Sequence, residues 1–482
     1  MPTSSARPDE VELVVVGGGT AGILTATTAA ALGARVVMIE RAPAPGGDCL
    51  WTGCVPSKSL LSAARSVAAV RAGAHGLPGA TGDVDLGSVL AAVQAAIDRI
   101  APDDSVETLT AAGVEVRRGT ARFTGPRSLE VDGVPVGFDQ AVVATGSEPR
   151  LPAVPGLAEL APLTSDTVWG LETLPARLLV LGGGSIGCEL AQAFARLGSH
   201  VVLAEVGPRL LPQEDADAAE LVRHALTFDG VDVRFGAAAV GVTAGGVTLA
   251  DGSTARADRV LVAVGRSPRT AGLGLEAAGV AVDGQGRVLV DDHLRTSNPA
   301  VWAAGDVTPH PQYTHLAGVH GSVVAANAVL GLRRRASAVL VPRVTFTDPE
   351  VAAVGLSPEQ GRTQGRRVVR VEHRAVDRAV AEQRTDGFTT LVLDRRRRVV
   401  GALVVGPRAG ETIGEAALAV QRRVSVSALV GVTHPYPTFN DGLWNAAVGE
   451  YRSWLGGRPV RSVLDALRRI RRARRQAGRR LG

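Results

Sequence analysis

Two cysteines in the segment 46–58 are the residues whose type and spacing most directly suggest chemistry. Cys49 and Cys54 are two of only three cysteines in the chain, and Lys58 is its only lysine. A turn between the cysteines, which Gly53 favours, would let the two sulfurs meet. A helix starting near Pro56 would bring its positive end close to Cys54 and stabilise a thiolate there. The segment predicts a redox-active disulfide; from the pair alone, a structural disulfide or two free core thiols are alternatives.

A dinucleotide-binding fingerprint built on a glycine-rich turn precedes this segment. A buried strand over residues 13–16 leads into a glycine motif that suits a tight turn, close approach to a pyrophosphate and helix–strand packing. The three glycines are Gly17, Gly19 and Gly22. A second strand, over residues 35–39, ends at Glu40, where a carboxylate is placed to accept hydrogen bonds from a ribose diol.

The same unit recurs later in the chain. A strand over residues 178–181, a helix through residue 197 and a strand over 200–204 surround the second glycine motif, which consists of Gly182, Gly184 and Gly187. The acid that follows is Glu205, and in both units the acid lies 23 residues after the first glycine. One such motif can arise by chance, but two complete units predict two dinucleotide-binding folds.

Three further strands lead into glycine turns that would return the chain to a nucleotide. Residues 141–146 end in Thr145 and Gly146, residues 260–266 contain Gly265, and residues 301–306 end in Asp306, which could accept from a polyol. From residue 342 the pattern changes to alternating strands (343–346, 389–393 and 399–405) and two helices. This pattern indicates an α+β domain.

Composition fits a large enzyme. At 482 residues the chain has room for two to four domains, and its 3% aromatic content disfavours a surface on which nucleic-acid bases stack. Low cysteine use and the lack of a signal peptide predict a reducing cytoplasm. The uncharged run 13–34 fits the first strand and helix, so we expect no membrane insertion. We predict no resident metal site.

Charge is concentrated at one end of the sequence. Residues 458–482 hold ten arginines and one aspartate, a local +9 against a net +5, so the rest of the chain is near −4. Apolar residues at 460, 463, 464, 467 and 470 have helical spacing. An anionic membrane or a nucleic acid could bind such a helix, but a solvated, partly frayed helix is favoured, and we assign it no function.

Together these motifs resemble the class I pyridine nucleotide-disulfide oxidoreductases, a family that includes dihydrolipoyl dehydrogenase, glutathione reductase and mercuric reductase. The resemblance covers about residues 9–455. It implies an α/β fold with two Rossmann-like domains, for FAD and NAD(P), and a C-terminal α+β dimerisation domain. The implied FAD-binding domain is 9–150 and 273–338, the NAD(P)-binding domain 151–272, and the interface domain of a homodimer 339–455, followed by an Arg-rich tail, 456–482.

The resemblance also implies roles for the residues singled out above. Gly17, Gly19, Gly22 and Glu40 would bind the adenosine half of FAD, with Thr145 and Gly146 beside it and Asp306 on the ribityl chain. The second glycine motif and Gly265 would serve the nicotinamide cofactor. Glu205 there would repel a 2′-phosphate, so we predict NADH, although Arg209 is near enough in sequence to keep NADPH possible.

At the redox centre, the resemblance places Lys58 near flavin N5, paired with Glu189. It makes Cys54 the flavin-side thiolate and Cys49 the interchange thiol that meets the oxidant. Trp51 stands where many relatives have Asn and alters the surface beside the disulfide. Cys188, inside the second glycine helix, is expected to be a packing residue.

The clearest departure from the family is the segment 436–441. Relatives that handle dithiols have His-Pro-Thr-x-x-Glu there, donated across the dimer, whereas this chain has Tyr436 and Asp441 at the His and Glu positions. A phenol with a pKa of about 10 is a poor base near neutral pH. His434, two residues earlier, is either a substitute base or a turn residue.

Tyr at this position is shared with mercuric reductases, although no cysteine follows Cys188 to supply their C-terminal cysteine pair. We therefore predict a mercuric-reductase-like flavoprotein that passes electrons from NAD(P)H through FAD and the Cys49–Cys54 disulfide to a soft metal, a disulfide or another small oxidant. The alternatives are a dihydrolipoyl dehydrogenase with His434 as its base and a quinone-reducing diaphorase. A flavin redox sensor that binds nucleic acid through the Arg-rich tail is a remote alternative.

Overall fold

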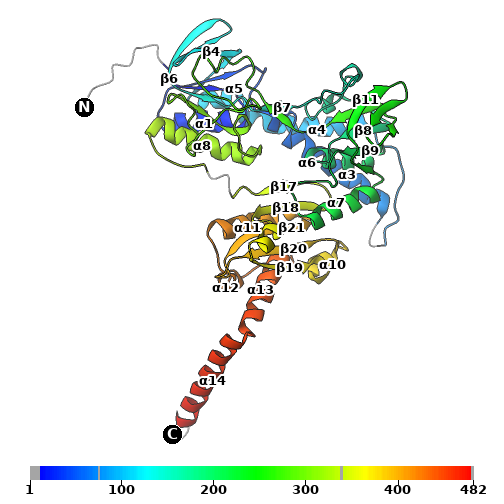
Figure 1. Ribbon diagram of the computed structural model, residues 1–482, viewed down its shortest axis with the longest axis vertical. Coiled ribbons are helices and arrows are strands. Elements are labelled where there is room, and N and C mark those ends of the chain that lie inside the picture. The colour runs from blue at the N-terminus through cyan, green and yellow to red at the C-terminus, as the bar shows by residue number, and fades with distance from the viewer. Residues whose placement is uncertain (1–10, 74–75, 337–339, 479–482) are drawn as a thin grey trace, which may run out of the picture. The chain divides into compact units, whose positions relative to one another are not determined.

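The computed structural model describes residues 11–73, 76–336 and 340–478. The chain divides into two compact units. The first unit contains residues 1–212 and 223–339, and the second contains 213–222 and 340–482. Figure 1 shows the helices and strands of both units.

The larger sheet of the first unit has seven strands in the order β3-β2-β1-β6-β5-β4, with β16 paired to β6. Strands β3, β2, β1, β6 and β16 are parallel, and β4 and β5 are joined antiparallel to β6. The end of β1 is a run of four buried apolar residues, as is typical of a parallel strand covered on both faces. The strands are β1 (Val11–Val16), β2 (Val36–Glu40), β3 (Val114–Arg118), β4 (Ala121–Gly125), β5 (Ser128–Val131), β6 (Val134–Val143) and β16 (Val301–Ala303).

A second parallel sheet in the same unit has the order β10-β9-β8-β14. A three-stranded antiparallel sheet, β11-β12-β13, and a short pair, β7 and β15, accompany it. The elements are β7 (Ser147–Pro149), β8 (Arg177–Leu181), β9 (His200–Glu205), β10 (Asp232–Phe235), β11 (Ala239–Thr243), β12 (Gly246–Leu249), β13 (Thr254–Ala255), β14 (Arg259–Val262) and β15 (Arg266–Pro268). The two parallel sheets confirm the predicted pair of Rossmann-like folds. The domain boundaries at residues 150, 272 and 338 stay predictions.

Helices in the first unit begin at both glycine motifs and at the cysteine segment. Helix α1 packs beside α8, as Figure 1 also shows, and α3 packs against α4 and α6. The helices are α1 (Thr20–Ala31), α2 (Gly47–Trp51), α3 (Cys54–Ala72), α4 (Leu86–Ile100), α5 (Val106–Ala111), α6 (Ser185–Leu197) and α8 (Thr314–Leu330). Helix α7 (Ala216–Phe228) begins within the second unit and continues into the first.

The second unit is built on an antiparallel sheet with the order β17-β18-β21-β20-β19. Its strands are β17 (Arg343–Thr345), β18 (Glu350–Gly355), β19 (Arg367–Glu372), β20 (Phe388–Leu393) and β21 (Val399–Gly406). The helices are α9 (Pro358–Thr363), α10 (Asp377–Ala381), α11 (Ala409–Gln421), α12 (Val426–Val430), α13 (Asp441–Leu455) and α14 (Arg458–Gly478). The expected α+β pattern is present, but the prediction of two helices was wrong. Helices α9, α10 and α12 are too short to show an apolar repeat in the sequence.

Within the described ranges, none of the helices combines the length and the apolar character needed to cross a bilayer. The uncharged run 13–34 forms the end of β1, a glycine turn and α1, as expected.

Candidate active site

The two cysteines lie on consecutive helices of the first unit. Cys49 is inside α2, and Cys54 is the first residue of α3, so the helix begins two residues before the expected start at Pro56. Gly53 makes the turn between them possible, because a Cβ there would lie 2.8 Å from the carbonyl oxygen of Asp48. Both thiols are half-buried, and neither is linked in a disulfide.

The two thiols have opposite pKa shifts. A hydrogen bond with Cys49 is the largest cause that lowers the pKa of Cys54, to about 6; burial opposes it, and Thr314 and Lys58 also lower the pKa. The Thr314 hydroxyl lies 3.3 Å from the Cys54 sulfur. The pKa of Cys49 is raised, first by its hydrogen bond to Cys54 and then by burial. The geometry therefore places the negative charge on Cys54 and the proton on Cys49.

Lys58 pairs with Glu189 beside these thiols. Its ammonium is 2.9 Å from a carboxylate oxygen of Glu189, which lies on α6 and has only 7% of its side chain exposed. Lys58 is one helical turn beyond Cys54 on α3, so its charge favours the thiolate. The pair joins residues 131 positions apart, one from each glycine-motif fold.

The first glycine loop is shaped by contacts that exclude any side chain. Gly17 has φ +108°, and a Cβ there would lie 2.5 Å from the carbonyl oxygen of Ala144. A Cβ on Gly22 would lie 1.8 Å from the carbonyl oxygen of Gly17. Helix α1 begins after Gly19 with no side-chain cap, so its first amides face the loop. Such a loop fits the pyrophosphate of a dinucleotide.

The second glycine loop repeats this arrangement in the other Rossmann-like fold. Gly182 also has φ +108°, and a Cβ there would lie 2.5 Å from the carbonyl oxygen of Ala263. A Cβ on Gly187 would lie 1.9 Å from the carbonyl oxygen of Gly182, whereas Gly184 faces open space at the uncapped start of α6. Gly265, on the loop after β14, has φ +112°. Both loops have the room and the amide donors that a dinucleotide needs.

The acids after the two loops have a role that the sequence did not reveal. Glu40 accepts a hydrogen bond of 2.5 Å from the amide of Gly18, and Glu205 accepts one of 2.6 Å from the amide of Gly183. Each carboxylate therefore holds its own glycine loop. Binding of a ribose by the same carboxylates stays a prediction.

Asp306 and Thr145 lie where the strands of the larger sheet end. Asp306 accepts a 2.8 Å hydrogen bond from the Ser147 hydroxyl, and burial raises the pKa of its carboxyl. The Thr145 hydroxyl donates to the carbonyl oxygen of Arg269 at 2.6 Å. Gly146 follows with φ +72°.

Two arginines near these residues were missed by the sequence reasoning. Arg266 and Arg269 both pair with Asp48, the residue before Cys49, and the Arg269–Asp48 distance is 2.9 Å. Arg269 also lies 3.3 Å from Asp166. The only sequence signal is the position of Arg266 directly after Gly265, which does not reveal the partner.

In the second unit, His434 is held on both sides of its ring. Nδ1 is 3.0 Å from the carbonyl oxygen of Val432, and Nε2 is 2.8 Å from the Glu415 carboxylate. Only 6% of the side chain is exposed. Because both partners are acceptors, both ring nitrogens are used in holding the imidazole. Glu415 lies on α11, and the sequence gave no sign of this contact.

Tyr436 and Asp441 have different surroundings from each other. The Tyr436 side chain is exposed, and a hydrogen bond from its phenol to Asp377 raises its pKa. Asp441 is buried at the start of α13 and accepts from the amide of Thr438 at 3.0 Å. Asp441 thus stabilises the start of its own helix, in contrast to the Glu that orients a base in relatives.

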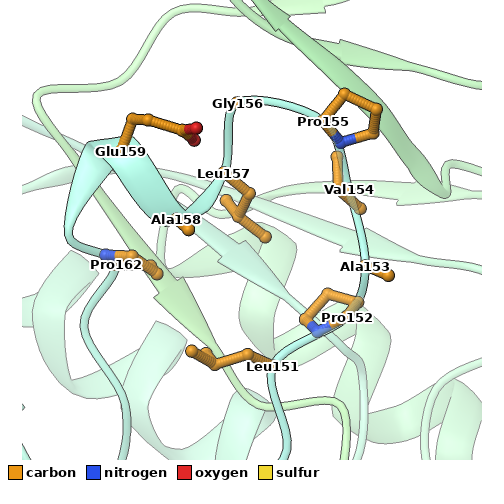
Figure 2. Close-up of a pocket in the computed structure, with 10 residues that line it drawn as sticks. All are labelled: Leu151, Pro152, Ala153, Val154, Pro155, Gly156, Leu157, Ala158, Glu159 and Pro162. Carbon is orange, nitrogen blue, oxygen red and sulfur yellow. The ribbon is translucent and has the colours of Figure 1, made fainter.

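A cavity of about 340 Å³ lies in the loop after β7, and none of the residues named above lines it. Figure 2 shows its lining, which comes from residues 151–162 and has Glu159 as its only charged side chain. None of the lining residues is a cysteine, so the cavity has no thiol to exchange with a disulfide. Among the described residues, no group of three or more His, Cys, Asp or Glu could hold a metal ion.

The fold and site define a flavoprotein disulfide oxidoreductase with two dinucleotide-binding folds. The chain belongs to the pyridine nucleotide-disulphide oxidoreductase family, which matches residues 11–321, and its dimerisation domain matches residues 341–447. The protein is therefore an NAD(P)H-dependent enzyme that uses FAD. The match to the dimerisation domain supports a homodimer.

Relatives with different activities resemble the chain almost equally. A mercuric reductase of Lysinibacillus sphaericus is 36% identical over 452 residues, which cover 91% of this chain and 82% of the relative. A dihydrolipoyl dehydrogenase of Thermus scotoductus is 39% identical over 463 residues, covering 90% of this chain and 96% of the relative. Sequence identity therefore does not select one of these two activities.

Solved structures show the same architecture. The HOCl-induced flavoprotein disulfide reductase RclA of Escherichia coli, in its Cu(II) complex, has a TM-score of 0.82 and 28% identity. LpdA of Mycobacterium tuberculosis has a TM-score of 0.83 and 29% identity. Each match covers 91% of this chain and 99% of the other chain.

Proposed function

We propose that the protein is a reductase of a small thiophilic oxidant, with a soft metal ion such as Hg(II) as the preferred class. The proposal rests on one contrast within the segment 434–441. The titratable side chain exposed there is the phenol of Tyr436, while the imidazole of His434 is enclosed and has both nitrogens occupied. The segment thus offers no free base near neutral pH.

A soft metal ion suits this arrangement better than a disulfide does. Reduction of a disulfide breaks its S–S bond, and the thiolate that leaves benefits from a proton donor. A soft metal ion bound by the thiolates of Cys49 and Cys54 would instead accept two electrons as those two sulfurs form their disulfide again, with no S–S bond of the substrate to break. Thiolate sulfur is the ligand that soft ions prefer. Cys54 is placed to keep a thiolate, and Cys49 would become one on losing its proton to the solvent or to the bound ion's ligands.

Specific residues would hold the cofactors. The loops of Gly17–Gly19 and Gly182–Gly184 would bind the pyrophosphates of FAD and the nicotinamide cofactor, and Asp306 would bind the ribityl chain. When bound, FAD accepts a hydride from the nicotinamide cofactor and transfers two electrons to the Cys49–Cys54 disulfide. The Glu189 carboxylate would hold the Lys58 ammonium in place, and that ammonium would favour the Cys54 thiolate during this transfer.

NADH is the proposed electron donor. Glu205 keeps a carboxylate at the end of β9, and Arg209 donates to the carbonyl oxygen of Pro212 at 2.9 Å. A 2′-phosphate beside Glu205 would meet a like charge. The carboxylate of Glu205 and the hydrogen bond that occupies Arg209 both favour the unphosphorylated cofactor. We place the enzyme in the cytoplasm, since its low cysteine use suits a reducing compartment.

An anaerobic steady-state screen tests the proposal. The purified holoenzyme is given NADH with Hg(II) in excess thiol, lipoamide, glutathione disulfide or a soluble quinone. We expect Hg(II)-dependent NADH oxidation that is lost in Cys49→Ser and impaired in Tyr436→Phe, with slow turnover of lipoamide.

Rapid lipoamide reduction that disappears in His434→Ala would reverse the assignment and make the protein a dihydrolipoyl dehydrogenase. Quinone reduction that survives in Cys49→Ser, without Hg(II) activity, would make it a diaphorase. In both cases the protein would still be an NAD(P)H-dependent flavoprotein of this family, and only the proposed class of oxidant would be wrong.

A further inference from the structure

Helix α14 (Arg458–Gly478) is a feature that the proposed function does not use. The family's dimerisation domain match ends at residue 447, before α14 begins, so family membership does not account for this helix. Figure 1 draws α14 in red after α13. Almost every described side chain from Arg461 to Gln476 is exposed.

The helix exposes an apolar stripe. Val463, Leu467 and Ile470 are 59%, 56% and 52% exposed, and their spacing of four and three residues places them on one face. The partly exposed Val460 and Leu464 border the same stripe. Isolated apolar residues on a surface need no explanation, but a continuous stripe along one helix indicates a surface that another body covers.

The opposite face is strongly basic. Arg461, Arg468, Arg472 and Arg475 follow helical spacing on that face, and the span 460–476 contains seven arginines in all. Its only acid is Asp465, 3.5 Å from Arg468. Arg471 borders the apolar stripe, and Arg474, four residues after Ile470, ends it; such long side chains can bury their stems and keep the charge in water.

We propose that α14 binds the surface of an anionic lipid bilayer and lies in the plane of the interface. A second copy of the helix is a poor occupant, because each copy has a net charge of +6 over residues 460–476. A nucleic acid would satisfy the arginines but leave the apolar stripe exposed to water. An anionic bilayer suits both faces of the helix. Its acyl chains would bury the apolar stripe, and its anionic head groups would pair with the guanidinium groups.

Vesicle flotation of the full-length FAD-loaded protein tests this inference. The probes are phosphatidylcholine vesicles with and without phosphatidylglycerol, at low and high salt. We expect binding to the anionic vesicles, weakened by salt. Each arginine near such a surface strengthens binding roughly fivefold, so Arg468→Gln/Arg472→Gln/Arg475→Gln should weaken it about 100-fold.

The apolar stripe is tested by Val463→Ser/Leu467→Ser/Ile470→Ser, which should weaken vesicle binding at least about tenfold. Ser462→Ala/Gln476→Ala is the matched control on the polar face and should bind as the wild type does. All variants should keep bound FAD and dye reduction, which shows that the body of the protein folds.

Three results would overturn the inference. They are the absence of binding to anionic vesicles at low salt, unchanged binding by the apolar-stripe variant, and binding to a DNA duplex without binding to vesicles. The last would assign α14 to nucleic acid. None of them affects the proposed reductase activity, which is measured without lipid.

Discussion

The cysteine segment of the first unit and the segment 434–441 of the second unit differ in how their chemistry is built. Cys49 and Lys58 lie within five residues of Cys54 along the chain. The turn and the helix start that position these three residues are formed by the same stretch of sequence. In the segment 434–441, the side chains of His434 and Tyr436 are each held by a residue on another element, whereas Asp441 has a partner inside the segment. Glu415 holds His434, and Asp377 holds the phenol of Tyr436.

This difference explains why the sequence was enough to place Cys54 beside Lys58 but not to assign a role to His434. Spacing along a helix brings Cys54 and Lys58 together whatever the rest of the fold does. By contrast, the choice between His434 as a base and as a structural residue depends on α11, a separate helix. A local motif can therefore be read directly, whereas a motif held by distant partners needs the structure.

The largest expected effect concerns the two cysteines. Cys54→Ser should abolish the long-wavelength thiolate-to-flavin absorbance and lower Hg(II) reduction by roughly 10³-fold or more, because the redox pair is lost. Cys49→Ser should lose the activity but retain or enhance the absorbance. Anaerobic dithionite titration should consume about four electrons per FAD in the wild type and about two in each variant. Two electrons in the wild type would remove the disulfide from the mechanism.

Tyr436→His tests the second segment. The change should raise the rate of lipoamide or glutathione disulfide reduction. General acid–base catalysis contributes at most about 10²-fold to 10⁴-fold. The gain should be smaller here because Asp441 already accepts a hydrogen bond from the amide of Thr438 and is not free to orient a new base. Steady-state rates with each disulfide give the measurement. Dye reduction is the control and should not change.

His434→Ala provides the matching test of the comparison. Since both ring nitrogens are used structurally, the variant should lose thermal stability and keep its low disulfide reductase activity. If the activity falls and the stability stays the same, His434 is a base and the contrast between the two segments is wrong.

A smaller effect is expected at Glu205. Glu205→Gln keeps an acceptor for the Gly183 amide and removes the charge, so the preference for NADH over NADPH should narrow by about tenfold. The ratio of kcat/KM values for the two cofactors is the measurement. A wild type that is tenfold more efficient with NADPH would contradict the assignment. Glu40→Gln, in the other loop, is the control and should leave the ratio unchanged.

The smallest predicted effect is on the Cys54 thiolate. Its pKa is lowered to about 6, so the thiolate absorbance of the reduced enzyme should persist above that pH and disappear below it. Thr314→Val removes one hydrogen bond to the sulfur, worth about 1 kcal/mol, so the transition should move to higher pH by less than one unit. A pH titration of the absorbance measures the shift. Thr314→Ser should restore the wild-type profile, and an unshifted Val variant would exclude Thr314 from this role.

Much of the fold could be predicted because its signals are local. The strands β1, β8 and β9 are nearly continuous apolar runs, and each glycine motif sits at a turn where a Cβ would collide with the backbone. The helices α9, α10 and α12 escaped prediction, since five or six residues are too few to show an apolar repeat.

By itself, the sequence determined the class of chemistry: two glycine loops for dinucleotides, a pair of cysteines, and the lysine one turn beyond them. The physical reason is that backbone sterics and helical spacing act over a few residues. The family resemblance also predicted the pairing of Lys58 with Glu189 across 131 positions, which the structure contains. Only the tertiary structure decided that Thr314 contacts Cys54 and that Glu415 encloses His434. Those contacts depend on how separate elements pack, and packing is a property of the whole fold.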